Sequence, residues 1–192
     1  KDVIENCVSG SNIVVENMSP WESTPEPNFV WGNLITTFTN HSLFDPANTP
    51  YKHQVECWKH LMPTHMDDDN RPSILVTTGT GSGKTECFMY PVLSDLYEQG
   101  RTNAIEAIFL YPLNALMEDQ KKRLNEYCEA TGLHFAVYNG DTPEYHADGR
   151  NETLSNEIPT RAQIREQSTR PEILLTNPSM LEYILVRQKD QD

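Results

Sequence analysis

The chain has 192 residues, of which 37% are hydrophobic, and this is enough apolar material for one compact core. It carries 15 Lys and Arg residues against 28 Asp and Glu residues, and the net charge of −13 argues against broad electrostatic adhesion to nucleic acid. The sequence shows no amino-terminal signal and no apolar stretch near the ~20 residues that a membrane span needs. We therefore expect a soluble, cytoplasmic protein of bacterial type with no membrane partner.

The first 42 residues show little hydrophobic periodicity. They are punctuated by Pro20, Pro25 and Pro27. We interpret residues 1–42 as an N-terminal extension that lies on a domain formed by residues 43–192.

Neither the cysteines nor the acidic run of the chain predicts a metal site. The four cysteines are far apart and form no C-x-x-C pair, which indicates reduced thiols rather than a zinc site or a disulfide framework: Cys7, Cys57, Cys87 and Cys128. The three consecutive carboxylates at 67–69 lie in a polar stretch, which is typical of a solvated loop.

A glycine-rich loop is the first strong feature in chain order. A helix is predicted over residues 52–62, a strand over 73–78 and a second helix over 84–98, which contains Pro91. Residues 78–85, at the junction of that strand and helix, have the sequence TGTGSGKT. This is a strand, a loop and a helix start in the order that phosphate binding requires.

The residue types in this loop suit a nucleoside triphosphate. Gly81 and Gly83 allow backbone N–H groups to approach phosphate oxygens, which a Cβ would obstruct. Lys84 supplies a charge for the β- and γ-phosphates, Thr85 offers its hydroxyl to Mg²⁺, and the helix N-terminus adds partial positive charge. The strict pattern has a glycine where this chain has Thr78.

Strands and helices alternate through the rest of the chain. Strands are predicted over 104–110, 134–138 and 172–176, and helices end near residue 131, lie near 161–167 and span 178–187. A turn is expected at 139–143 and a polar loop over 144–171. The apolar run at 104–110 suits a parallel strand that is buried on both faces. The alternation predicts an α/β fold, with a mostly parallel sheet covered by helices on both faces.

Polar residues follow two of these strands. Asn177 is a favoured N-cap and Pro178 suits the first helical position, so a helix is expected to begin there. The free N–H groups of this helix, with the Thr176 hydroxyl, suit a nucleic-acid phosphate, and plain helix capping is the alternative. Residues 112–116 follow the strand at 104–110, at the sheet edge where open α/β folds bind ligands.

Five blocks, taken in order, resemble the first RecA-like P-loop NTPase domain of superfamily 2 DEAD/DEAH-like ATP-dependent DNA helicases. They cover about residues 43–192: YKHQ at 51–54, TGTGSGKT at 78–85, YPLNALMEDQ at 111–120, NGD at 139–141 and LLTNPSMLEY at 174–183. The similarity is to the branch that contains the mitomycin-repair and Lhr-like helicases and large bacterial phage-defence helicases. The phosphate loop alone indicates an NTPase, and the later blocks carry the helicase assignment.

The resemblance implies a role for each block. Gln54 matches the family's adenine-reading glutamine, whose amide can pair with N6 and N7 of the base, and Tyr51 matches a residue that stacks on it. The alternative is that both residues simply lie at the start of one helix and have no role in binding the base. The implied ATP and Mg²⁺ contacts in the loop, with Lys84 and Thr85 as the catalytic pair and Thr85 as the metal ligand, are Thr80, Gly81, Ser82, Gly83, Lys84, Thr85 and Glu86. The implied nucleic-acid contacts are Pro112, Leu113, Asn114, Gly140, Asp141, Thr176, Asn177 and Pro178.

The resemblance implies the ATP-binding half of a helicase or translocase. Its partner would be single-stranded or partly duplex DNA rather than RNA, with phage defence and DNA repair both open as pathways. The acidic motif that holds Mg²⁺ and a second RecA-like domain with an arginine finger would lie outside residues 1–192, so this part alone is expected to be inactive. Two alternatives stay open: another P-loop enzyme such as a kinase, and a nucleotide-gated nucleic-acid-binding domain without hydrolysis.

Overall fold

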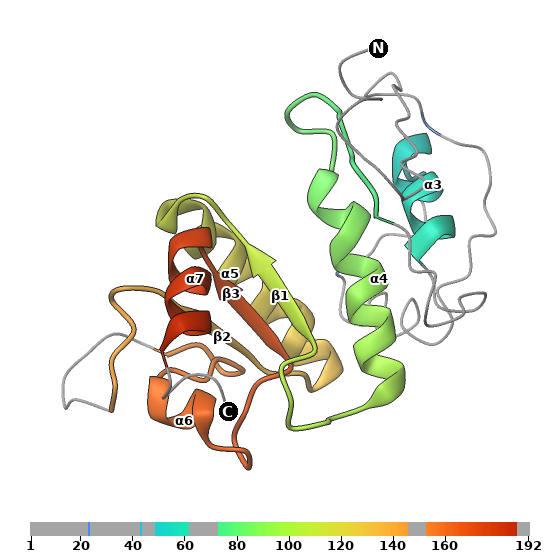
Figure 1. The fold of residues 1–192 in the computed structure, drawn as a ribbon. Coiled ribbons are helices and arrows are strands. Elements are labelled where there is room, and N and C mark those ends of the chain that lie inside the picture. Colours follow the sequence, from blue (N-terminus) through green and yellow to red (C-terminus); the bar gives the residue numbers. More distant parts are fainter. Residues whose placement is uncertain (1–22, 24–42, 44–48, 62–72, 146–152, 188–192) are drawn as a thin grey trace. The chain divides into compact units, whose positions relative to one another are not determined.

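The computed structural model describes residues 23, 43, 49–61, 73–145 and 153–187 (Figure 1). The chain divides into two compact units, one formed by residues 1–31 and 45–95 and the other by residues 32–44 and 96–192. The predicted acidic loop at 67–69 lies outside the described residues, as does Cys7. The same holds for the predicted extension over 1–42, apart from Ser23, which forms an isolated antiparallel bridge with Tyr51.

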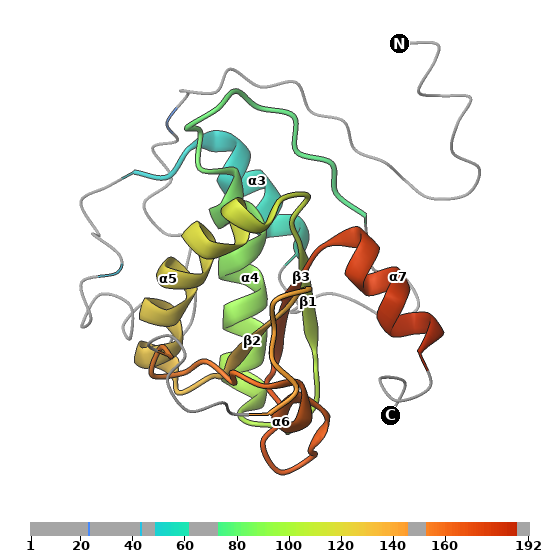
Figure 2. The same cartoon turned by 90° about the vertical axis from the view of Figure 1, so that its left-hand side faces the viewer.

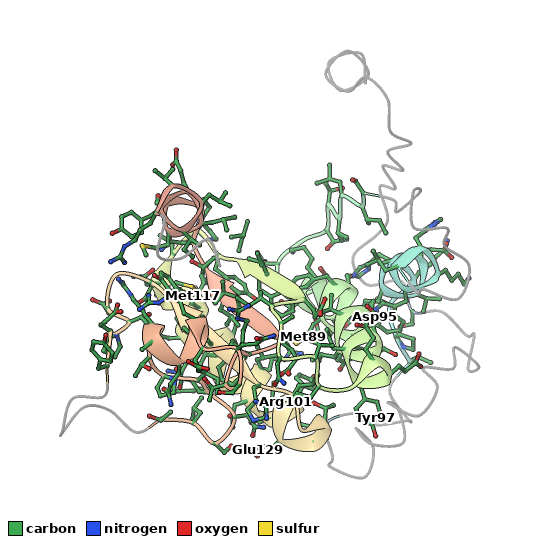
Figure 3. The ribbon with its side chains drawn as sticks, turned by 60° about the horizontal axis from the view of Figure 1, so that its bottom comes forward. Met89, Asp95, Tyr97, Arg101, Met117 and Glu129 are labelled. Atoms are coloured by element: carbon green, nitrogen blue, oxygen red, sulfur yellow. The ribbon has the colours of Figure 1, made fainter. Side chains whose placement is uncertain are left out.

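Two helices organise the first unit, and both were predicted. α3 spans Lys52–Leu61, and α4 spans Lys84–Gln99 with Pro91 inside it. Trp58 on α3 and Met89 on α4 are buried, and Met89 is among the residues labelled in Figure 3. The rings of Trp58 and Tyr90 lie 5.9 Å apart, so aromatic packing joins the two helices.

The predicted strand over residues 73–78 is wrong. The segment has no continuous ladder and contains a single bridge position at Ile74. Leu75, within this apolar run, is 52% exposed. An apolar run becomes a strand only where neighbouring strands accept and donate its backbone hydrogen bonds, and hydrophobicity by itself does not supply those neighbours.

The second unit contains a three-stranded parallel sheet with strand order β1-β3-β2. Its elements, in chain order, are β1 (Ala107–Leu110), α5 (Asn114–Thr131), β2 (Phe135–Tyr138), α6 (Arg161–Arg165), β3 (Ile173–Thr176) and α7 (Pro178–Val186). The three strands therefore lie within the predicted ones, and each is shorter. Leu110, Thr176 and Tyr138 are register partners, so the carboxyl ends of all three strands are level.

Helices cover both faces of this sheet, as predicted (Figure 2). α5 packs against β2 and β3 on one face, and its Met117 is fully buried. On the opposite face, side chains of both strands and of α6 form a core cluster against which α7 packs: Ala136, Tyr138, Leu174 and Ile164, covered by Met180 and Ile184. The alternation of side chains along each strand therefore supplies two separate cores.

The predicted burial of β1 on both faces is also wrong. Phe109 is buried, whereas Ile108 is 47% and Leu110 is 48% exposed. Among the described residues, β1 lies at one edge of the sheet and pairs only with β3. In the described part of the chain, we find no helix with both the length and the apolar character to cross a membrane.

Candidate nucleotide site and nucleic-acid edge

The phosphate loop ends at the first residue of α4. Gly81 and Gly83 have φ values of 75° and 71°, a region that glycine adopts without steric cost. Thr80 and Gly81 are exposed, whereas Ser82 is buried. The N–H groups at the start of α4 have no partner within the helix, so the loop and the helix N-terminus together suit a polyanion.

The loop is folded back on its own polar groups. The Lys84 ammonium donates to the carbonyl oxygens of Thr78 and Gly79 at 2.9 and 2.6 Å. The Ser82 hydroxyl donates to the Gly79 carbonyl at 2.8 Å and lies 2.6 Å from the Thr78 hydroxyl. The residue that departs from the strict glycine pattern is thus part of the loop's internal hydrogen bonding.

Gln54 connects α3 to the loop. Its Oε1 accepts from the Tyr51 backbone N–H at 2.9 Å, the return contact of a capping box, and its Nε2 donates to the Gly83 carbonyl at 3.0 Å. A Cβ on Gly83 would lie 2.3 Å from that Nε2. Each end of the amide still has capacity for one further hydrogen bond, which the base-reading role requires.

His53 and Trp58 belong to the same contact and were missed from the sequence. His53 Nε2 lies 2.8 Å from the Ser82 carbonyl, and its ring stacks on Tyr51 at a centroid distance of 5.6 Å. Trp58 Nε1 donates to the Glu86 carbonyl at 3.0 Å. For Trp58 the available clue was its spacing from Gln54, since positions four apart share a helix face. His53 is adjacent to Gln54 in the sequence, so this spacing gave no signal for it.

Two ionisable groups near the loop are held in their neutral forms. Burial lowers the pKa of His53, the Lys84 charge lowers it further, and the hydrogen bond to Ser82 opposes both effects. A hydrogen bond with Cys57 and burial raise the pKa of the Cys87 thiol. Thr85 and Glu86, which follow Lys84 in the first turn of α4, are half-buried.

In the second unit, the predicted nucleic-acid residues gather at one edge. All three segments follow the level carboxyl ends of β1, β2 and β3. The exposed members are Pro112, Leu113, Asn114, Gly140, Asp141 and Pro178. α5 begins at this edge with Leu113 as its N-cap and no side-chain cap, so backbone N–H groups are available there.

Asn177 joins two of these segments. Its side chain caps α7 by accepting from the Met180 N–H at 2.8 Å, and Pro178 occupies the first turn, so the predicted helix start is confirmed. Its Nδ2 donates to Asn114 Oδ1 at 3.3 Å. The N-termini of α5 and α7 therefore lie side by side.

The sequence predicted that the Thr176 hydroxyl would face a nucleic-acid phosphate, and the structure disagrees. Thr176 is fully buried, and its Oγ1 donates to the Tyr138 carbonyl of the neighbouring strand at 2.6 Å. Thr176 ends the central strand, where its hydroxyl reaches a backbone carbonyl of the neighbouring strand. This hydroxyl therefore ties β3 to β2 and is not presented to a phosphate.

Arg161 supports the turn at 139–142 and was also missed. Its guanidinium donates to the Asn139 carbonyl at 2.8 Å and lies 4.9 Å from the centre of the Tyr138 ring. The Asn139 side chain accepts from the Asp141 N–H at 2.9 Å, which closes the turn. Gly140 and Asp141 are thus held at the edge by a cation from α6.

Comparison with known proteins agrees with this arrangement. Residues 51–192 match the family model described as DEAD/DEAH box helicase. The chain is 29% identical to the Druantia protein DruE of Escherichia coli and 32% identical to the uncharacterized ATP-dependent helicase YprA of Bacillus subtilis, each over 68% of its length. It spans only 8% and 14% of those two proteins.

A solved structure shares the fold. The DUF1998 helicase MrfA bound to DNA matches 98% of this chain and 24% of its own, with a TM-score of 0.60 and 23% identity. MrfA has also been solved with DNA and AMPPNP. The chain has the RecA-like α/β fold of superfamily 2 helicases, and it belongs to the DEAD/DEAH box helicase family.

Proposed function

We propose that this chain is the ATP-binding part of an ATP-dependent helicase or translocase that acts on DNA. The observation that carries the proposal is the phosphate loop, with its two positive-φ glycines, its lysine and the contact from Gln54. Family membership supports it, as does the likeness in fold to MrfA, which has been solved bound to DNA and bound to DNA and AMPPNP.

The loop residues fit a triphosphate. The Lys84 ammonium donates to two carbonyl oxygens of the loop. Phosphate oxygens are charged and would be stronger acceptors for it than these carbonyls. A Cβ on Gly83 would lie 2.3 Å from Gln54 Nε2, so glycine at this position lets the loop lie against the Gln54 amide. The amide of Gln54 and the ring of Tyr51 would bind the adenine, which would make ATP the preferred nucleotide.

Mg²⁺ would neutralise charge on the β- and γ-phosphates when bound. Thr85 would hold the ion through its hydroxyl, and Glu86, one position later, would face the same phosphates. A water-orienting acid and an arginine finger are also needed for hydrolysis, and other parts of the protein would supply them. The chain covers a small share of its relatives, which leaves room for those parts.

The edge at the ends of β1 and β3 would follow the DNA backbone. Two helix N-termini lie side by side there, and both favour an anionic group. Such contacts address phosphate and sugar, so binding would be indifferent to base sequence. Residues 43–192 would form the first RecA-like domain, residues 1–42 an extension, and a second RecA-like domain would be the partner.

Lys84→Ala tests the nucleotide site. We expect ATP affinity to fall by about 1.5–3 kcal/mol, because a charged donor to the phosphates is lost, while the fold is kept. Lys59→Ala is the matched control, since Lys59 lies on α3 and pairs with Glu56 at the surface. Calorimetry in which Lys84→Ala binds ATP as the parent does would remove the phosphate-loop assignment.

A further inference from the structure

His53 contacts the phosphate loop through one backbone group. Its Nε2 can meet the Ser82 carbonyl only as a donor, so the proton lies on Nε2 and Nδ1 is the unprotonated nitrogen. The side chain is 5% exposed, and Nδ1 is buried without a hydrogen-bond partner in the described part of the chain. Burying Nδ1 without a hydrogen-bond partner costs free energy, so the contact of His53 with the Ser82 carbonyl calls for an explanation.

Peptide planarity turns this hydrogen bond into an orientation for a donor. In a trans peptide, the carbonyl of one residue and the N–H of the next point in opposite directions. With the Ser82 carbonyl held toward α3 by His53, the Gly83 N–H faces away from α3. Gln54 holds the Gly83 carbonyl in the same manner, so the Lys84 N–H also faces away.

Two consecutive N–H groups are thereby aimed to the same side of the loop, as in a nest of backbone donors that binds an anion. They are aimed by side chains of another helix rather than by the loop itself. The stack of His53 on Tyr51 places the predicted base contact on the same support.

We propose that His53 is a positioning residue that sets the direction of the loop's N–H groups for the phosphates of ATP. The inference rests on the proposed function and adds a residue to it. His53 would touch no ligand atom, and its effect would act through the Ser82–Gly83 peptide. The Nε2–H donor therefore matters for phosphate affinity, and the aromatic ring matters for the base.

Two substitutions separate these features. His53→Phe keeps a flat ring beside Tyr51 and removes the donor. His53→Gln keeps an amide N–H near the position of Nε2 and removes the ring. Binding of ATP, inorganic tripolyphosphate and adenosine to the purified protein is measured by calorimetry for each variant, with melting temperatures recorded in parallel.

We expect His53→Phe to weaken ATP and tripolyphosphate by about tenfold, since a buried carbonyl loses its donor, and to leave adenosine unchanged. His53→Gln should keep both phosphate ligands within about threefold of the parent. A purely structural role predicts instead that all three ligands weaken together and follow the melting temperature, and this result would overturn the proposal. So would a folded His53→Phe that binds ATP like the parent.

His53→Gln decides alone if His53→Phe does not fold: retained tripolyphosphate affinity supports the role, and its loss contradicts the role. Failure of the proposed function gives a different pattern, because the folded parent would then bind no ATP at all. A parent that binds ATP, together with a weakened Lys84→Ala and an unchanged His53→Phe, contradicts only the part assigned to His53.

Discussion

The phosphate loop and the sheet edge present their polar groups in opposite ways. In the loop, the Lys84 ammonium, the Ser82 hydroxyl and the Gln54 amide all contact protein atoms. At the edge, Asn114 and the start of α5 are exposed, and no side chain caps that helix. A ligand of the loop must therefore replace internal hydrogen bonds, whereas a ligand of the uncapped N–H groups at the start of α5 adds new ones.

This difference predicts different responses to mutation. A group that already has protein partners supports the local structure as well as the ligand, so its loss should affect both. A group that is displayed should affect binding alone, unless it also caps a helix. The predictions below probe this distinction.

Gly83→Ala should have the largest effect. The new Cβ would meet Gln54 Nε2 at 2.3 Å, and the residue would have to keep a φ of 71°, which costs about 1–3 kcal/mol for a non-glycine residue. We expect ATP binding to be lost together with the contact between Gln54 and the loop. Calorimetry with ATP and the free energy of unfolding measure the two effects.

Gly100→Ala is the matched control for that change. Gly100 also has a positive φ, 74°, but a Cβ there would meet nothing within 4 Å. The Gly100→Ala variant should therefore lose stability from backbone strain while keeping its ATP affinity. Equal loss of ATP binding in the two variants would mean that the close approach of Gln54 does not matter.

Asn177→Ala should have an intermediate effect at the edge. Loss of the α7 cap should cost about 1 kcal/mol of stability, and removal of the contact with Asn114 should weaken single-stranded DNA binding without changing ATP affinity. Fluorescence anisotropy with labelled single strands provides the measurement.

Thr176→Val separates stability from DNA binding at the same edge. It removes the buried hydrogen bond to the Tyr138 carbonyl at nearly constant volume, so it should destabilise the protein and leave DNA binding unchanged. If Asn177→Ala binds DNA like the parent and Thr176→Val does not, then Thr176 contacts DNA and Asn177 does not, which contradicts the roles given to them here.

The smallest expected effect is a dependence of stability on pH. Burial lowers the pKa of both His53 and His134 below 6.5, their ordinary value. As pH falls through 6.5, the unfolded chain takes up protons that the folded protein does not, so the free energy of unfolding decreases. Above that pH, both states are neutral at these sites and the contribution is complete.

Replacing either histidine by glutamine should flatten this decrease between about pH 7 and 5. Denaturant titrations at several pH values measure the slope. The two variants test the two regions separately, because His53 supports the loop and His134 lies in the second unit, where it is next to the buried Glu172. An unchanged slope in both variants would show that carboxylates alone set the acid response.

Much of the local structure could be predicted. The phosphate loop, the N-cap at Asn177 and the end of α5 at Gly132 each depend on hydrogen bonds or φ values within a few residues, and residue type reports these directly. The order of strands and helices in the second unit could be predicted from hydrophobic periodicity, because periodicity also depends on residues that are close in the sequence. These features also placed the candidate nucleic-acid residues in segments that meet at one edge.

The partners of the site residues could not be predicted, because they lie far along the chain. His53 and Gln54 contact residues 29 positions away, and Thr176 contacts one 38 positions away. The sequence alone determined that a phosphate loop precedes a helix and that a helix starts after β3. Tertiary structure alone decided that Thr176 is buried, that residues 73–78 form no strand and that α3 holds the loop, since burial and pairing depend on neighbours that residue type does not encode.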